Sequence, residues 1–168
     1  MKIIFPGSFD PFTRGHASVV TRALAFCDEI LIAVGYNDAK SGMFSVEERV
    51  RMIERYYRDN PRIKVDAYKT LTVDYAAQQG ITHILRGVRT VVDFEYERSM
   101  ADVNRHLTGI ETILLFNETA MAHISSSTVR ELLHYGKDVS DFMPEGFELA
   151  MPKDKNALNK FRNSILKQ

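Results

Sequence analysis

The sequence predicts an α/β fold: a single Rossmann-like, doubly wound domain of 168 residues with a five-stranded parallel sheet in the order 3-2-1-4-5. Three observations predict it. Short runs of β-branched residues alternate with longer segments of helical periodicity, which is typical of parallel sheets with right-handed crossovers. The strand runs are almost continuously apolar, as expected for strands covered on both faces. Helix start and stop signals fall between these runs.

Five short runs are predicted as strands because they are rich in Ile, Val and Leu and bounded by polar or turn residues. In chain order they are KIIF (2–5), ILIAV (30–34), IKVDAY (63–68), THILR (82–86) and ETILLF (111–116).

Helices are expected between these runs. The first begins near Arg14, and the second begins at Ser45, which forms a capping box with Glu48. The third, around residues 73–79, stops at Gly80, a good C-terminal stop.

The remaining helical segments lie in the second half of the chain. One covers about 91–107, with an apolar stripe expected to face the core, and it ends before Gly109. After the last strand we expect a helix over about 126–135, then a polar helical tail from about residue 153. We expect residues 1–168 to form one domain, since there is no internal repeat or linker.

Composition restricts the function. Lys and Arg number 22, as do Asp and Glu, so the formal net charge is zero, which argues against a nucleic-acid binder with a broad cationic face. Cys27 is the only cysteine, so no intrachain disulfide can form. We see no signal-peptide pattern, and the most apolar window, EILIAVGY (29–36), is far too short to span a bilayer. We therefore expect a cytoplasmic protein without membrane or nucleic-acid partners.

The expected topology directs attention to two loops. In doubly wound sheets, ligands bind beyond the carboxyl edge, where the strand order reverses. The first and fourth strands flank that crevice, and they lead into PGSFDPFTRGH (6–16) and RGVRTVVDFEYE (86–97).

The first loop lacks both the dinucleotide fingerprint G-x-G-x-x-G and the Walker pattern. It contains two glycines, which permit close ligand approach, and the hydroxyls of Ser8 and Thr13. His16 lies at the helix entrance, where the helix dipole favours a neutral imidazole that can donate to a phosphate. Each residue alone fits an ordinary turn or cap; together they favour phosphate binding.

The second loop places Arg86 and Arg89 on either side of Gly87, an arrangement that suits a polyphosphate, although a solvated pair would also explain it. Asp93, Glu97 and Asn104 then follow along one side of the helix.

A third stretch, ISSSTVRE, combines a capping box of Thr128 and Glu131 with three serines at 125–127. These serines are equally compatible with an anion-binding site at the helix N-terminus and with an ordinary serine-rich helix start. Lys40 follows the second strand and is weak evidence alone. No histidine has metal-ligand spacing with carboxylates or the cysteine, so no metal site on the protein is expected.

The motifs resemble a known family. PGSFDPFTRGH resembles the signature [ST]-F-D-P-x-[TH]-x-G-H of the nucleotidyltransferase superfamily, and ISSST resembles its second signature. ILRGVRTVVDFEYE followed by NRHL, together with MFSVEERV, is similar to stretches of bacterial phosphopantetheine adenylyltransferases. The resemblance extends from Met1 to about Pro144.

The resemblance implies reversible transfer of AMP from ATP to 4'-phosphopantetheine, which gives 3'-dephospho-CoA and pyrophosphate in coenzyme A biosynthesis. It also implies Mg²⁺ with ATP, a homohexamer and feedback inhibition by CoA. The chemistry is compatible, since direct in-line attack of one phosphate on another requires positioning and charge stabilisation rather than a covalent enzyme intermediate.

The resemblance also assigns roles to residues. The catalytic group is His16, Lys40 and Ser8. The residues implied for ATP are Ser8, Phe9, His16, Gly87, Val88, Arg89, Glu97, Met121, Ala122, His123, Ile124, Ser125, Ser126 and Ser127. Those implied for 4'-phosphopantetheine are Ser8, Lys40, Leu71, Thr72, Arg86 and Asn104.

Two alternatives stay open. A nicotinate or nicotinamide mononucleotide adenylyltransferase is compatible with ISSSTVR, although RGVR with DFEYE is not its usual pattern. A nucleotide-binding sensor without catalysis could share the fold, but the presence of His16, Lys40 and both arginines weighs against it.

Overall fold

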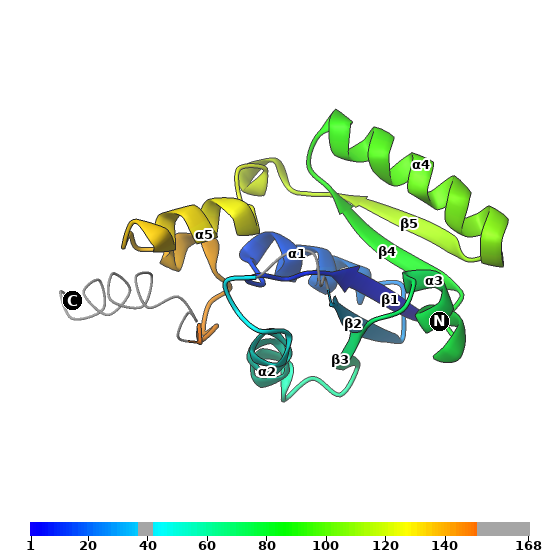
Figure 1. The fold of residues 1–168 in the computed structure, drawn as a ribbon, viewed down its shortest axis with the longest axis horizontal. Coiled ribbons are helices and arrows are strands. Elements are labelled where there is room, and N and C mark those ends of the chain that lie inside the picture. Colours follow the sequence, from blue (N-terminus) through cyan, green and yellow to red (C-terminus); the bar gives the residue numbers. More distant parts are fainter. Residues whose placement is uncertain (37–41, 151–168) are drawn as a thin grey trace.

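The computed structural model describes residues 1–36 and 42–150. Its centre is a five-stranded parallel sheet in the order β3-β2-β1-β4-β5, which confirms the predicted fold class (Figure 1). The strands are β1 (Lys2–Gly7), β2 (Glu29–Gly35), β3 (Ile63–Tyr68), β4 (His83–Val88) and β5 (Glu111–Phe116).

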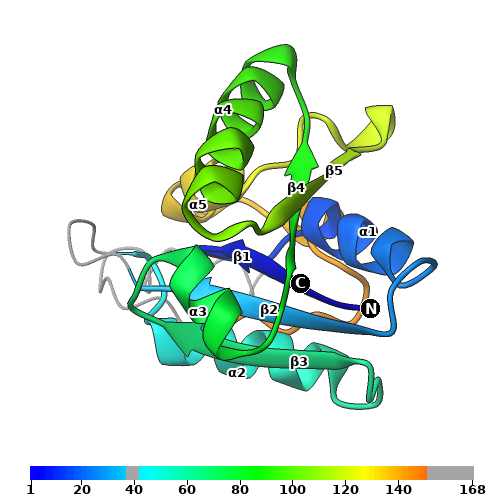
Figure 2. The same cartoon turned by 90° about the vertical axis from the view of Figure 1, so that its right-hand side faces the viewer.

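Helices cover both faces of the sheet. They are α1 (Arg14–Ala23), α2 (Val46–Tyr57), α3 (Thr72–Gln78), α4 (Val91–Thr108) and α5 (Ser126–His134), with 3-10 turns at Thr119–Met121 and Ser140–Phe142. Residues of α1 and α2 share one buried cluster with alternate side chains of β1 and β2, and α3 belongs to a second cluster on the opposite face. Figure 2 shows α4 beside β4 and β5, and α2 beside β3.

The gap that positions the site lies between β1 and β4. Strands β1 and β2 pair along their whole length, from Lys2↔Glu29 to Gly7↔Val34, whereas β1 and β4 pair only at Ile4↔Ile84. Beyond that pair their carboxyl ends are not joined by a ladder. The strand order reverses at this point, so the structure opens where the topology predicts a ligand crevice.

Most predicted bounds agree with the structure, and the differences have local reasons. β1 and β4 continue two residues beyond the predicted ends, because neighbouring strands continue the ladder past residues of weak strand propensity, as in Gly7↔Val34 and Val88↔Phe116. The capping box of Ser45 and Glu48 is present, with Glu48 N 3.2 Å from Ser45 Oγ. Gly80 and Gly109 have φ of 65° and 74°, as expected of helix stops.

Two expectations about helices are wrong. The N-cap of α5 is Ser125, whose Oγ accepts from the Thr128 amide at 3.1 Å, so Thr128 lies inside the helix and does not cap it. The apolar stripe of α4 does not face the core of this chain: Val92 is 78% exposed, and Glu97 is the buried residue of the helix. The expected polar tail from about residue 153 lies outside the described residues.

Candidate active site

A cavity of about 320 Å³ occupies the crevice between β1, β4 and the start of α1. We call it the His16 cavity. Of the residues implied for ATP, those that line it are Ser8, Phe9, His16, Gly87, Arg89, Glu97, Ile124, Ser125, Ser126 and Ser127. The other four are not among its lining residues: Val88 is buried, and residues 121–123 form the turn that precedes α5.

His16 is fixed at the entrance of α1 by a reciprocal contact with the N-cap. The backbone amide of Thr13 donates to His16 Nδ1 at 3.0 Å, and the Thr13 hydroxyl lies 3.0 Å from the same nitrogen. Because Nδ1 accepts, the proton of the neutral ring is on Nε2. Aromatic rings surround the imidazole, with the Phe9 and Phe12 ring centroids 5.1 and 5.3 Å away.

The electrostatics of the cavity keep His16 neutral. Burial, followed by the positive charges of Arg89 and Arg86, lowers the pKa of His16 from 6.5 to about 3. An uncharged imidazole with its proton on Nε2 is a hydrogen-bond donor, as the sequence predicts. With so low a pKa, the imidazole is a poor general base near neutral pH.

This protonation state gives a prediction about acid stability. Between pH 6.5 and about pH 3 the unfolded chain binds a proton at His16 that the folded protein does not, so stability is lost as the pH falls through this window. We expect the urea midpoint to fall between about pH 7 and about pH 4, and to fall less in His16→Gln. His106 lies on the exposed side of α4, so the urea midpoint of His106→Gln should change with pH as that of the wild type does. Equal acid sensitivity of wild type and His16→Gln would contradict a neutral His16.

Arg86 connects the two strands that flank the gap. Its Nε and Nη2 donate to the Glu97 carboxylate at 2.8 and 2.6 Å, and its Nη1 donates to the Pro6 carbonyl at 2.7 Å. These bonds use three of the five N–H groups of a guanidinium, so two stay available for a phosphate. Glu97 thus orients Arg86 within the cavity wall.

The loop after β1 has a backbone shape that its sequence explains. Phe9 has a φ of 47°, in the left-handed region that side chains rarely adopt. A Cβ on Gly7 would lie 2.8 Å from the Phe9 ring, so only glycine fits beneath that ring. A larger residue at position 7 would thus displace the Phe9 ring, and the strained turn lies at a candidate active site, where such strain is common.

The serines at the start of α5 have structural partners. Ser125 is the N-cap, Ser126 Oγ donates to the Pro11 carbonyl at 2.8 Å, and Ser127 Oγ accepts from Arg130 at 3.0 Å. These contacts fix the helix start against the loop after β1. Backbone amides in the first turn of a helix are groups that can bind an anion.

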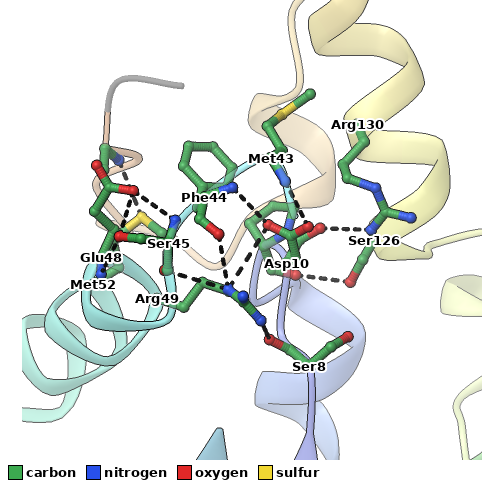
Figure 3. A network of polar contacts seen from close by, with 12 residues as sticks. Ser8, Asp10, Met43, Phe44, Ser45, Glu48, Arg49, Met52, Ser126 and Arg130 are labelled. Carbon is green, nitrogen blue, oxygen red and sulfur yellow. Dashed lines mark hydrogen bonds and ion pairs between the residues drawn. The ribbon is translucent and has the colours of Figure 1, made fainter. Parts of the chain in front are cut away.

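A buried polar network, missed by the sequence reasoning, supports the same loop (Figure 3). The Asp10 carboxylate accepts from the Met43 and Phe44 amides, both at 2.9 Å. Arg49 of α2 donates to the Ser8 carbonyl at 2.6 Å and to the Phe44 carbonyl at 3.1 Å. The network ties the turn containing Ser8 to the segment before α2. Lys40, implied as catalytic, lies outside the described residues.

A second cavity, of about 660 Å³, adjoins the first along α4. We call it the α4 cavity. It is lined by Leu71, Thr72 and Asn104, all implied for 4'-phosphopantetheine, and it shares Ser8 and Arg86 with the His16 cavity. The structure therefore brings ten of the fourteen residues implied for ATP, and every described residue implied for 4'-phosphopantetheine, into two cavities that share Ser8 and Arg86.

Comparison with known proteins identifies the family. The cytidylyltransferase-like family model matches residues 4–132. The chain is 58% identical over 148 residues to a protein of Bacteroides thetaiotaomicron, and 56% identical over 146 residues to one of Porphyromonas gingivalis; both are named phosphopantetheine adenylyltransferase. These matches cover 88% and 87% of this chain and 98% and 95% of the relatives.

Solved structures share the fold at low identity. A bifunctional NMN adenylyltransferase/ADP ribose pyrophosphatase from Francisella tularensis, complexed with AMP and manganese ion, has a TM-score of 0.66 and 17% identity. The match covers 96% of this chain and 49% of the Francisella chain, so this chain spans about half of that protein. The family match over most of the sequence decides the assignment: the chain belongs to the phosphopantetheine adenylyltransferase family of cytidylyltransferase-like proteins.

Proposed function

We propose that the protein transfers the adenylyl group of ATP to 4'-phosphopantetheine, forming 3'-dephospho-CoA and pyrophosphate in coenzyme A biosynthesis. The observation that carries the proposal is the meeting of the two cavities at Ser8 and Arg86. ATP occupies the His16 cavity, whose wall is rich in N–H donors. The pantetheine arm occupies the α4 cavity, and its phosphate lies where the two join.

The residues then act by position and charge. Arg86, held by Glu97, binds the acceptor phosphate with its two remaining N–H groups. An acceptor oxygen attacks the α-phosphorus in line, and pyrophosphate leaves. The Nε2–H of His16 donates to an α-phosphate oxygen and stabilises charge that accumulates in the transition state. Ser8 positions the acceptor, and Lys40 has the phosphate-binding role implied by the family.

Magnesium is proposed to arrive with ATP. The carboxylates that line the His16 cavity are Asp93 and Glu97, and each accepts from an arginine, Arg89 and Arg86 respectively. Within residues 1–36 and 42–150, no group of three metal-ligating side chains gathers into a cation site. Because both carboxylates are paired with arginines, Mg²⁺ would be held mainly by triphosphate oxygens and water, as is usual at nucleotide sites. The ion would neutralise phosphate charge.

The assembly and regulation are also proposals. The stripe of Val92, Tyr96, Met100, Val103 and Leu107 on α4 is exposed in the single chain, and all of it except Val92 also lines the α4 cavity. An exposed apolar patch of this kind supports the expected homohexamer. We also propose feedback inhibition by CoA, a cytoplasmic location and a single domain over residues 1–168. No helix among the described residues has the length and apolarity to cross a membrane.

A pyrophosphate-release assay with different acceptors tests the proposed function. With ATP and Mg²⁺, we expect pyrophosphate only when 4'-phosphopantetheine is added, and none with nicotinate mononucleotide. Equal rates with the two acceptors would overturn the substrate assignment. If the protein binds ATP but adenylylates neither acceptor, the result would favour a nucleotide-binding sensor without catalysis.

A further inference from the structure

Asn117 lines the His16 cavity, and none of the sequence motifs assigns it a role. It follows β5, and its backbone amide donates to the Val88 carbonyl at 2.7 Å. Its side chain lines the cavity together with Gly15 and Gly87. The backbone bond fixes the position of this residue, and its side-chain amide is left to make other contacts.

The side-chain oxygen of Asn117 has no hydrogen-bond partner. Among the described residues, three buried side-chain oxygens lack one: Tyr57 Oη, Thr112 Oγ1 and Asn117 Oδ1. Of these three residues, Asn117 is the one that lines the His16 cavity. A buried acceptor without a donor is unfavourable, and native proteins keep few of them. A ligand that supplies a donor would remove this penalty.

The Asn117 amide packs against two glycines. A Cβ on Gly15 would lie 3.4 Å from Asn117 Nδ2, and a Cβ on Gly87 would lie 3.1 Å from Oδ1. The amide therefore stands between two stretches of bare backbone. Val19 and Ile124 add apolar walls, whereas His16, Arg86 and Arg89 supply the polar groups of the cavity. This distribution of groups would place the phosphates of a nucleotide at the polar groups and its base beside Asn117.

Because Oδ1 is buried and faces Gly87, the amide must turn to reach the base. The χ2 torsion of Asn is broad and roughly two-fold, and turning it breaks no hydrogen bond of Oδ1, because Oδ1 makes none. A side-chain amide offers one acceptor beside donors, which complements the amine and adjacent ring nitrogen of adenine. Hypoxanthine and guanine place a carbonyl where adenine has its amine.

We propose that Asn117 is a specificity residue that reads the base of the nucleotide: Oδ1 accepts from the adenine amine and Nδ2 donates to the neighbouring ring nitrogen. The inference rests on the proposed function for the identity of the nucleotide. It adds a side-chain contact that selects a 6-aminopurine.

The test compares ATP with purine riboside triphosphate, which has the same ring without the amine. In wild type, kcat/KM for ATP should exceed that for the analogue by about tenfold or more, because the analogue leaves Oδ1 unpaired. Asn117→Leu should lower kcat/KM for ATP and leave the analogue nearly unchanged, so that the two values come within about twofold. The control is Tyr57→Phe, which removes another unpartnered buried oxygen from a residue that does not line the His16 cavity. This variant should prefer ATP over the analogue as strongly as the wild type does.

Equilibrium binding of both nucleotides, without phosphopantetheine, separates this inference from the proposed function. If wild type binds ATP more tightly than the analogue, Asn117→Leu does not, and no acceptor is adenylylated, the proposed function fails and the inference holds. If 4'-phosphopantetheine is adenylylated but Asn117→Leu weakens both nucleotides equally, the inference is overturned and the proposed function holds. Equal use of ATP and the analogue by wild type also overturns the inference.

Discussion

His16→Ala should lower kcat by on the order of 10²-fold or more, with little change in KM for ATP. The reason is that the Nε2–H donates to charge that develops on the α-phosphate only in the transition state. A bond made only there contributes to kcat rather than to ground-state binding. Steady-state pyrophosphate release gives both constants.

The design of this experiment includes two controls. His106→Ala removes a histidine from the exposed side of α4 and should retain full activity. Circular dichroism melting would verify that His16→Ala folds, since His16 also caps α1 through its contact with Thr13. Unchanged kcat with a raised KM would mean that His16 is a ground-state binding residue, contrary to the proposed role.

Arg49→Met should destabilise the fold by roughly 3–5 kcal/mol, the range for breaking a buried ionic group. The Arg49 and Asp10 side chains are both 9% exposed, and their charged atoms are 4.0 Å apart. Truncation leaves the Ser8 and Phe44 carbonyls without their donor and the Asp10 carboxylate without its cation. For a chain of this size, the melting temperature should fall by about 10 °C.

The matched control lies on the same helix. Arg55 of α2 pairs with Glu148 at 2.6 Å, and both side chains are more than half exposed, 60% and 68%. Exposed pairs contribute about 0–1 kcal/mol, so Arg55→Met should melt close to wild type. Equal melting temperatures for the two arginine variants would contradict a structural role for the network of Asp10 and Arg49.

The sequence predicts the fold because local patterns and topology agree. Apolar runs identified all five strands, and the Ser45 capping box and Gly109 gave helix ends within about a residue of those observed. The reversal of strand order then predicts that PGSFDPFTRGH and RGVRTVVDFEYE lie at one crevice, and residues of both line the His16 cavity. Topology therefore located the site, and the resemblance proposed its chemistry.

What the sequence did not predict depends on contacts between distant residues. Asp10 bonds to amides 33 and 34 residues away, and Arg49 reaches back 41 residues to Ser8, so no local pattern marks them. The cap of α5 was assigned to Thr128 because a capping-box pattern begins there, but the extended backbone of Ser125 makes it the cap. The apolar residues of the α4 stripe recur at helical spacing. That spacing would be the same whether the stripe packs on the core of this chain or on another surface, so it does not predict which surface covers it.

Asn117 illustrates a third reason. An asparagine after a strand is typical of a turn, and nothing in the sequence separates that role from a ligand contact. Its signal is structural: an unpartnered buried oxygen between two glycines that are far apart in the chain. Such a signal exists only after the fold has brought Gly15, Gly87 and Asn117 together.

The most direct test of the account follows the α-phosphorus of ATP in a single turnover. The protein, Mg²⁺ and 4'-phosphopantetheine are mixed with ATP labelled at that atom, and the products are separated. We expect the label to pass directly into 3'-dephospho-CoA, with none bound to the protein. Label that accumulates on the protein would contradict direct in-line transfer, and label that stays in ATP or appears only in AMP would contradict the proposed function itself.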